Sequence, residues 1–347
     1  MEVDCQRAMN FWLIYRFLYD AKLTFREGLV QNSYEPDGPY YEVRTVKDVE
    51  AATKDYIAPF FEHAGETALM LSGGVDSAIL ASYVPKGTVT YTMTDGGNTS
   101  EVDGAQKYAK KYGLHNEVVA TTWADYQEYA PLLMRQKGAP IHSIEVQIYK
   151  IALHARKNGF KNLLFGERAD QVFGGHTRLY SRDWTLEEFF EGYAFVNPFE
   201  VLANPLKLDG PMREFTDNKG MVDVYGFINK YQLRQSVGGY INACSLAKIN
   251  FLSPYNKMRL MEKLDTERIR RGDSKYLIRE LFKERYEDFE TPEKVPMPRA
   301  VDEYLADWRG PTRPEFLSNI DISKLTGDKK WYVYCLEWFL NLIEEVE

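Results

Sequence analysis

The sequence predicts an α/β protein built on a doubly wound parallel sheet, with a mostly helical C-terminal half and a short N-terminal cap. Three observations predict this fold class. Strand-like and helix-like segments alternate over residues 67–173, which is typical of a parallel sheet covered by helices. The first strand runs into a glycine-rich turn that leads directly into a helix pattern. After residue 180 the apolar residues recur mostly at helical spacing, with Pro-rich loops between some segments.

The alternating region defines the expected sheet. The expected strands are 68–71, 88–94, 117–120 and 162–165, and the connecting helices include 101–112 and 140–157. The first of these helices carries Ala105 and Tyr108 on one apolar face and stops at Gly113. Ligands of such sheets bind beyond the carboxyl ends of the strands. The loops 72–77 and 166–175, which follow two of the strands, are therefore the expected site.

The two flanking regions complete a division into three parts. We expect an N-terminal cap over 1–64, an α/β domain over 65–180 that carries the two loops, and a helical region over 181–347 that completes the expected site. The cap shows no residues that indicate chemistry; its expected elements are a helix at 10–23, a strand at 40–46 and a helix at 46–61. Helices are expected at 185–194, 222–247, 256–264, 275–286, 300–308 and 328–346, with Gly238-Gly239 interrupting the second.

Composition excludes several classes of protein. The chain has 347 residues and a net charge of −8, so a general nucleic-acid binder is not expected. Its three cysteines, Cys5, Cys244 and Cys335, are far apart and form no CxxC pair, which disfavours a disulfide framework and a zinc site. No apolar run is long enough to span a membrane, and the N-terminus lacks a signal-peptide pattern. We expect a cytoplasmic protein with neither a nucleic-acid nor a membrane partner.

The loop 72–77, in the stretch LMLSGGVDSAILAS, has the features of a phosphate-binding turn with one addition. Gly73 and Gly74 allow the backbone to approach a ligand closely, and Ser72 and Ser77 supply hydroxyl groups. The spacing is not that of a Walker loop. Asp76 would repel phosphate unless a divalent cation bridged the two. The alternative interpretation is a glycine turn with a Ser/Asp helix cap.

The loop 166–175 repeats this arrangement of glycines and fixed carboxylates at a strand end. Glu167 and Asp170 lie between Gly166 and the pair Gly174-Gly175. Because the two loops share one edge of the sheet, Asp170 is placed to share a cation with Asp76. The alternative interpretation is a solvated acidic turn.

Together these motifs resemble a known family. SGG-x-DS is similar to the signature of the ATP pyrophosphatase (PP-loop) superfamily, and SGGVDS followed by GE-x-AD-x-x-FGG resembles the synthetase domain of asparagine synthetase. The resemblance implies an adenine nucleotide alpha hydrolase-like fold. It covers roughly residues 67–308, and it continues in the segments 105–119, 250–256, 272–280 and 290–298.

The resemblance implies roles for individual residues. The pyrophosphate loop corresponds to Ser72, Gly73, Gly74, Asp76 and Ser77, and the magnesium-binding aspartates correspond to Asp76 and Asp170. The positions that contact adenine and ribose correspond to Met70, Leu71, Thr92 and Met93. Gly166 corresponds to a glycine beside the reacting centre, Glu167 to a glutamate that handles protons, and Lys294 to a lysine placed against the phosphates. Lys275 is a further candidate for the phosphates, with a helix-surface lysine as the alternative.

The sequence also departs from the family pattern, on the side of the substrate. Arg168 stands where a small glycine is usual, and Gln171 where glutamate is usual. A guanidinium here either pairs with a carboxylate or phosphate of the substrate or turns outwards without a role. Pro292 and Glu293 precede Lys294, where the family has an arginine.

The function that the resemblance implies is an ATP-dependent, AMP-forming amide ligase of the amidotransferase type, with ATP and Mg²⁺. It would activate a small-molecule carboxylate as an acyl-adenylate and transfer it to ammonia or an amine. The N-terminal glutaminase domain of the family is lacking and Cys5 is not at a mature N-terminus, so we expect free ammonia, an amine, or a separate glutaminase or other ammonia-supplying subunit. A homodimer is left open. The alternatives are another PP-loop adenylating enzyme, acting on a nucleobase or tRNA, and a catalytically degenerate nucleotide-binding protein.

Overall fold

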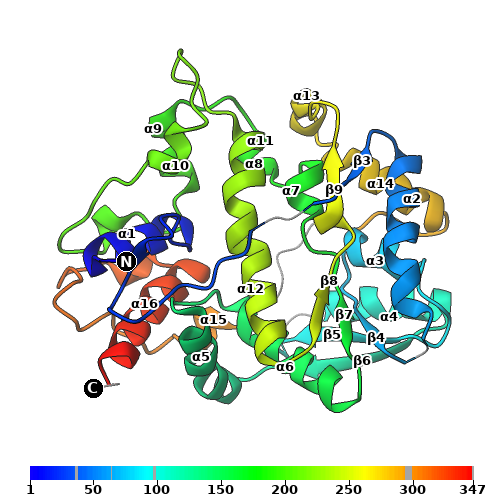
Figure 1. The fold of residues 1–347 in the computed structure, drawn as a ribbon, viewed down its shortest axis with the longest axis horizontal. Helices are drawn as coiled ribbons and strands as arrows, with labels where there is room; N and C mark the ends of the chain where they lie inside the picture. Colours follow the sequence, from blue (N-terminus) through cyan, green and yellow to red (C-terminus); the bar gives the residue numbers. More distant parts are fainter. Residues whose placement is uncertain (36–37, 64, 97–98, 294–298, 346–347) are drawn as a thin grey trace.

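The computed structural model describes residues 1–35, 38–63, 65–96, 99–293 and 299–345 (Figure 1). Its centre is a five-stranded, fully parallel sheet with the strand order β6-β5-β4-β7-β8. The strands are β4 (Thr67–Met70), β5 (Val89–Thr94), β6 (His115–Ala120), β7 (Asn162–Leu164) and β8 (Asn250–Leu252). Helices flank this sheet, so the predicted α/β fold class is confirmed.

The strand order decides where a ligand can approach the sheet. From β4 the chain builds β5 and β6 on one side and then crosses to place β7 and β8 on the other. The carboxyl end of β4 therefore lies at the point where the winding reverses, which is where open α/β sheets bind ligands. Leu69 pairs with Thr90 of β5 and with Leu164 of β7, so the loops that follow β4 and β7 leave the sheet side by side.

Helices cover the sheet in two groups. Helices α3 (Val75–Ala81) and α4 (Ser100–Tyr112) pack together against β4 and β5, whereas α6 (Ile144–Lys157) and α12 (Leu233–Leu246) pack together against β5 and β8. α4 buries Ala105, Tyr108 and Ala109 and ends at Gly113, whose φ of 64° is left-handed. This is the face and the stop that the apolar spacing predicts.

The remaining helices surround this framework. They are α1 (Cys5–Tyr15), α2 (Val46–Ile57), α5 (Trp123–Lys137), α7 (Ala169–Phe173), α8 (Thr177–Tyr180), α9 (Leu186–Tyr193), α10 (Gly210–Arg213), α11 (Val224–Phe227), α13 (Thr266–Arg270), α14 (Tyr276–Arg285), α15 (Val301–Tyr304) and α16 (Asp328–Glu344). Short parallel pairs are formed by β1 (Glu2–Val3) with β2 (Leu23–Thr24) and by β3 (Tyr41–Val43) with β9 (Met258–Leu260). The termini of the described chain lie near each other, since α1 packs on α16 (Figure 1).

Several elements differ from the sequence-based expectation. The segment 256–264 is not a helix: it contains β9, in which buried Met258 and Leu260 alternate with exposed Arg259, a strand period of two. Helix α5 was not expected, although Thr122 and Asp125 form a capping box at its start. Helix α1 starts at Cys5 rather than at residue 10, because the Asp4 side chain accepts a hydrogen bond from Arg7 N and caps it. Strand β8 was not anticipated as part of the sheet.

The glycine pair in α12 does not interrupt the helix, contrary to expectation. A Cβ on Gly239 would lie 3.2 Å from the side chain of Glu145 on α6. Gly239 therefore allows α12 and α6 to pack closely, and this packing offsets the roughly 1 kcal/mol by which glycine is less favourable than alanine in a helix.

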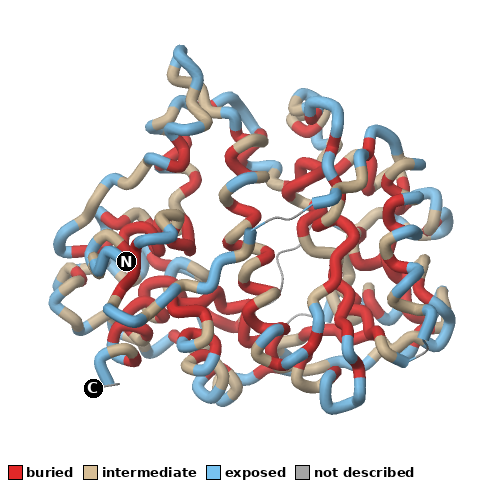
Figure 2. The backbone as a smooth tube through the Cα atoms, viewed as in Figure 1, coloured by how far each residue is buried: buried red, intermediate tan, exposed pale blue. Residues whose placement is uncertain are grey.

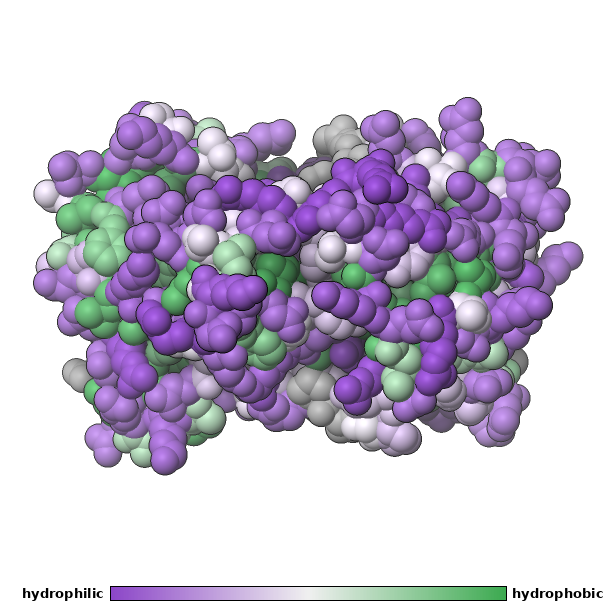
Figure 3. Space-filling view, turned by 90° about the horizontal axis from the view of Figure 1, so that it is seen from above, coloured by the Kyte–Doolittle hydropathy of each residue, from purple (hydrophilic) through white to green (hydrophobic). Residues whose placement is uncertain are grey.

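Buried residues from the N-terminal, central and C-terminal parts belong to one hydrophobic core, and Figure 2 shows buried backbone in all three parts. The proposed division at residues 64 and 180 remains a prediction. The face shown in Figure 3 is mostly hydrophilic, with apolar side chains in smaller patches. Among the helices of the described ranges, none has both the length and the apolar character needed to cross a membrane.

Candidate functional site

A cavity of about 650 Å³ opens at the carboxyl ends of β4, β5 and β7. It is lined by Met70 at the end of β4, by Leu71 directly after it, and by Thr92 and Met93 near the end of β5. One face of α12 and the residues that precede α14 form its other walls. The volume is in the range of small-molecule and cofactor sites.

The loop after β4 is held by its own hydroxyl groups and by α4. Ser72 N donates to Ser77 Oγ over 3.0 Å, and the two serine Oγ atoms are 2.9 Å apart. A Cβ on Gly104 of α4 would lie only 2.7 Å from Gly73 Cα. Glycine is thus required at position 104 for the loop to rest on the helix. The sequence did not point to Gly104, because its role depends on a contact between two separate elements.

Glu101, at the start of α4, is a further cavity residue that the sequence did not indicate. Its Oε2 accepts a hydrogen bond from Gly73 N over 2.8 Å. Burial raises the pKa of Glu101 above its ordinary value, and the hydrogen bond from Gly73 partly opposes that rise. The loop N–H that the sequence predicts will donate to a phosphate oxygen therefore donates to a carboxylate instead.

The two acidic loops meet directly. A Cβ on Gly166 would lie 3.0 Å from both Asp76 Cβ and Ser77 N, so the absence of a side chain at Gly166 brings the loops together. The ammonium of Lys275 lies between the two aspartates, with Nζ 2.7 Å from Asp76 Oδ2 and 2.9 Å from Asp170 Oδ1. Both carboxylates thus converge on one positive charge.

Lys275 is not a helix-surface lysine, so that alternative is wrong. Its side chain is buried, with a relative exposure of 6% for the residue, and its φ of 49° is left-handed, directly before α14. Burial alone would lower the pKa of Lys275, but the charges of Asp170 and Asp76 outweigh burial and raise it well above its usual range. The lysine therefore stays charged.

The carboxylates of Asp76 and Asp170 are ligands of the kind that a magnesium ion prefers. Mg²⁺ prefers oxygen ligands and is commonly held by one or two carboxylates together with phosphates and water. The two carboxylates already hold a cationic group between them. In the described ranges no group of three or more His, Cys, Asp or Glu is arranged to hold a metal.

Glu167 lies next to this acidic pair and faces α12. Ser236 Oγ donates to Glu167 Oε1, and Tyr240 also hydrogen-bonds the carboxylate. Burial raises the pKa of Glu167 above its ordinary value; the Ser236 hydrogen bond opposes this, and the charge of Asp170 adds to it. A carboxylate with a raised pKa is suited to accept a proton near neutral pH.

Arg168 is buried in the cavity wall, with 7% relative exposure, so the outward-turned alternative is wrong. Its Nη1 donates to the backbone oxygen of Asn256 over 2.6 Å, and its guanidinium lies 5.7 Å from the ring centre of Tyr40. Gln171 is buried on α7 and also lines the cavity. Any role of Arg168 toward a substrate remains a prediction.

The cavity wall contains every predicted site residue that lies within the described ranges. These are Met70, Leu71, Ser72, Gly73, Gly74, Asp76, Ser77, Thr92, Met93, Gly166, Glu167, Arg168, Asp170 and Lys275. Lys294 lies outside the described residues. The roles of all these residues in binding and catalysis stay predictions.

The sequence missed several other residues of the cavity wall. They are Arg16, Gln232, Gln235, Ser236, Tyr240 and Arg299. On α12 and the turn before it, polar side chains recur at positions 232, 235, 236 and 240. That spacing places them on one helix face and is a signal that could have identified this part of the wall. No local pattern singles out Arg16.

The chain resembles known proteins over this region. The family model described as asparagine synthase matches residues 61–266. A protein of Methanocaldococcus jannaschii, provisionally named a glutamine-hydrolysing asparagine synthetase, is 25% identical over 175 residues, which are 49% of this chain and 32% of the relative. A protein of Mycobacterium bovis with a similar provisional name is 27% identical over 165 residues, 46% of this chain and 24% of the relative.

These relatives are therefore matched over at most about a third of their length. The family match covers more than half of this chain, from the residues before β4 to the start of α13, and includes both acidic loops. This chain accordingly belongs to the asparagine synthase family.

Proposed function

We propose that this protein is an ATP-dependent, AMP-forming amide ligase that joins a small-molecule carboxylate to ammonia or a small amine. The observation that carries the proposal is the convergence of Asp76 and Asp170 on one cation beside the SGG loop. A site for nucleotide phosphates needs positive charge between phosphates and protein carboxylates. Membership of the asparagine synthase family supports the same reaction class.

Activation of the carboxylate is the first proposed step. An oxygen of the substrate carboxylate attacks the α-phosphorus of ATP, the bond from that phosphorus to the α,β-bridging oxygen breaks, and pyrophosphate leaves. Mg²⁺ bound by Asp76, Asp170 and phosphate oxygens would neutralise charge that develops on the phosphates. Lys275 holds the position between the two carboxylates in the ligand-free protein, and its ammonium would move toward the phosphates when the ion binds there. The Gly73 amide, which now donates to Glu101, would donate to a phosphate oxygen once Glu101 moves away.

Transfer to nitrogen is the second proposed step. The amine nitrogen forms a bond to the acyl carbon, the bond from that carbon to the phosphate oxygen breaks, and AMP leaves. The proton that the nitrogen loses passes to the Glu167 carboxylate, which Ser236 and Tyr240 hold in place. Glu167 is deprotonated only above its raised pKa, so the rate of this step is expected to rise with pH through that pKa.

Glu167→Gln should separate the two steps. We expect ATP–pyrophosphate exchange to remain within a few-fold of wild type while amide formation falls about 100- to 10,000-fold, the usual contribution of a general base. The rise of amide formation with pH should also disappear. Parallel assays of exchange and of amide product measure both effects, and an equal loss in the two assays would rule out this role for Glu167.

The proposed function is tested by carboxylate-dependent ATP–pyrophosphate exchange with the full chain, ATP and Mg²⁺. We expect a panel of small carboxylic acids to contain members that stimulate exchange, and hydroxylamine or ammonia to convert the same acids into hydroxamates or amides with release of AMP. Exchange that needs no carboxylate, or release of ADP in place of AMP, would refute the proposal.

A further inference from the structure

One face of α4 holds Gly73 of the loop after β4. Gly73 N donates to Glu101 Oε2 over 2.8 Å, and the carbonyl oxygen of Gly73 accepts from Tyr108 Oη over 3.2 Å. Between these contacts the helix touches Gly73 at Gly104, where a Cβ would lie 2.7 Å from Gly73 Cα. Residues 101, 104 and 108 recur at helical spacing and therefore lie on one face. Of these contacts, only that with Glu101 involves a charged group.

Glu101 is also the contact that can be released most easily. Tyr108 is 4% exposed and packs edge-on against the rings of Phe282 and Tyr286, so its hydroxyl group is fixed. Gly104 has no side chain to move. Glu101, in contrast, is partly exposed, lines the cavity and forms no ion pair with a lysine or arginine of the described ranges. Its carboxylate can therefore swing into solvent while Tyr108 and Gly104 keep the loop on the helix.

The Gly73 amide is the group that the SGG motif predicts as a donor to a phosphate oxygen. One N–H group makes a strong hydrogen bond with one acceptor at a time, and two anions this close repel each other. Glu101 and a phosphate oxygen therefore exclude each other at Gly73 N. Because a hydrogen bond to a charged group is worth about 10- to 100-fold in an equilibrium constant, either anion at the amide weakens the binding of the other.

We propose that Glu101 is a built-in competitor for phosphate at Gly73. Its carboxylate accepts from the amide until a phosphate oxygen takes its place, swings into solvent while the phosphate is bound, and returns when the phosphate leaves. ATP and pyrophosphate are both bound less tightly as a result, and pyrophosphate, the first product of the proposed reaction, is released faster. This inference rests on the proposed function for the assignment of the SGG loop to phosphate.

Glu101→Gln tests the competition, because glutamine keeps the size of the side chain but lacks the charge that makes glutamate a strong acceptor. Calorimetric titration of the full chain with inorganic pyrophosphate and Mg²⁺ should give a Kd about 5- to 50-fold lower than that of wild type. Adenosine, which carries no phosphate, should bind with a Kd within about twofold of wild type. Asp103→Asn is the matched control, because Asp103 is exposed in the same turn of α4 and lies outside the cavity wall; it should change neither Kd.

The direction of the change distinguishes a competitor from a structural anchor. If Glu101 only fixed the loop, its loss would loosen the phosphate site and raise the pyrophosphate Kd. A folded Glu101→Gln protein with an unchanged or higher pyrophosphate Kd therefore overturns the inference. An equal gain in adenosine binding also overturns it, since the variant would then act through the shape of the cavity. Carboxylate-dependent exchange by the same protein would in either case leave the ligase function standing.

Glu101→Asp separates competition for the amide from simple repulsion between charges, and it serves where the glutamine variant does not fold, as judged by circular dichroism. Aspartate keeps the charge on α4, but its shorter side chain does not reach Gly73 N from the same helix position. We expect a pyrophosphate Kd about 3- to 20-fold lower than that of wild type. A folded aspartate variant with the wild-type Kd overturns the inference.

Failure of the ligase proposal gives a different result. If no carboxylic acid supports exchange, but pyrophosphate binds and Glu101→Gln tightens that binding, the ligase proposal fails and this inference stands. If neither pyrophosphate nor ATP binds to wild type or to Glu101→Gln, the SGG loop is not a phosphate site and the inference is overturned.

Discussion

Asp76→Asn is expected to lower ATP–pyrophosphate exchange about 100- to 1000-fold, the loss that accompanies removal of one strong electrostatic contact in an active site. Asp76 is one of the two carboxylates that hold the Lys275 ammonium between the acidic loops. Asparagine keeps the size and one oxygen but removes the charge, so the Mg²⁺ concentration for half-maximal exchange should rise as well. Steady-state exchange across a magnesium series measures both effects.

The fold should survive this substitution. Lys275 keeps Asp170 as a charged partner, so no buried lysine is left without an anion. Asp103→Asn is the matched control, because Asp103 is exposed in the first turn of α4, away from the cavity wall. Near wild-type exchange by Asp76→Asn, with an unchanged magnesium dependence, would contradict the assignment of Asp76 to the metal.

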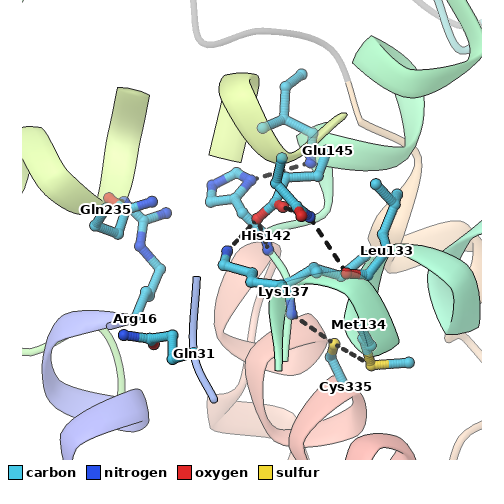
Figure 4. Close-up of polar contacts among 12 residues, drawn as sticks. Arg16, Gln31, Leu133, Met134, Lys137, His142, Glu145, Gln235 and Cys335 are labelled. Carbon is cyan, nitrogen blue, oxygen red and sulfur yellow. Dashed lines mark hydrogen bonds and ion pairs between the residues drawn. The ribbon is translucent and has the colours of Figure 1, made fainter. Parts of the chain in front are cut away.

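Lys137→Met is expected to lower the free energy of unfolding by about 3–5 kcal/mol, because it leaves Glu145 charged and buried without its ionic partner. Lys137 and Glu145 are 4% and 0% exposed, and Lys137 Nζ lies 2.6 Å from Glu145 Oε1. His142 N also donates to this carboxylate (Figure 4), and so does Asn242 Nδ2. These neutral donors provide hydrogen bonds to the carboxylate oxygens but do not neutralise the negative charge of Glu145. Urea denaturation followed by circular dichroism measures the change.

Two further variants isolate the cause. Lys150→Met removes a more exposed ion pair with Asp125 and should cost no more than about 1 kcal/mol. The double variant Lys137→Met with Glu145→Leu removes both charges and should recover most of the lost stability. A Lys137→Met protein as stable as Lys150→Met would show that Glu145 does not depend on its buried partner.

Most of the sheet and both acidic loops were predictable because their signals are local. The apolar run before Ser72 and the glycines after it define β4 and its turn without reference to any other part of the chain. The same is true of Gly166 and Asp170 after β7. Two of the failures, at β8 and at Gly239, came where a partner distant in sequence decides the structure. Strand β8 exists because it pairs with β7, and Gly239 stays helical because Glu145 packs against it.

The sequence alone determined the fold class and the family resemblance that the family match bears out, and it indicated the two loops that meet at the carboxyl edge of the sheet. The tertiary structure decided which charges share the cavity. Lys275 reaches two aspartates that lie 199 and 105 positions away, and Arg16 reaches the cavity from a segment with no motif of its own. Periodicity reports which face of an element is buried, whereas the pairing of charges depends on how distant elements pack. For that reason the reaction class could be proposed from the sequence, whereas the charged groups that share the cavity were known only from the fold.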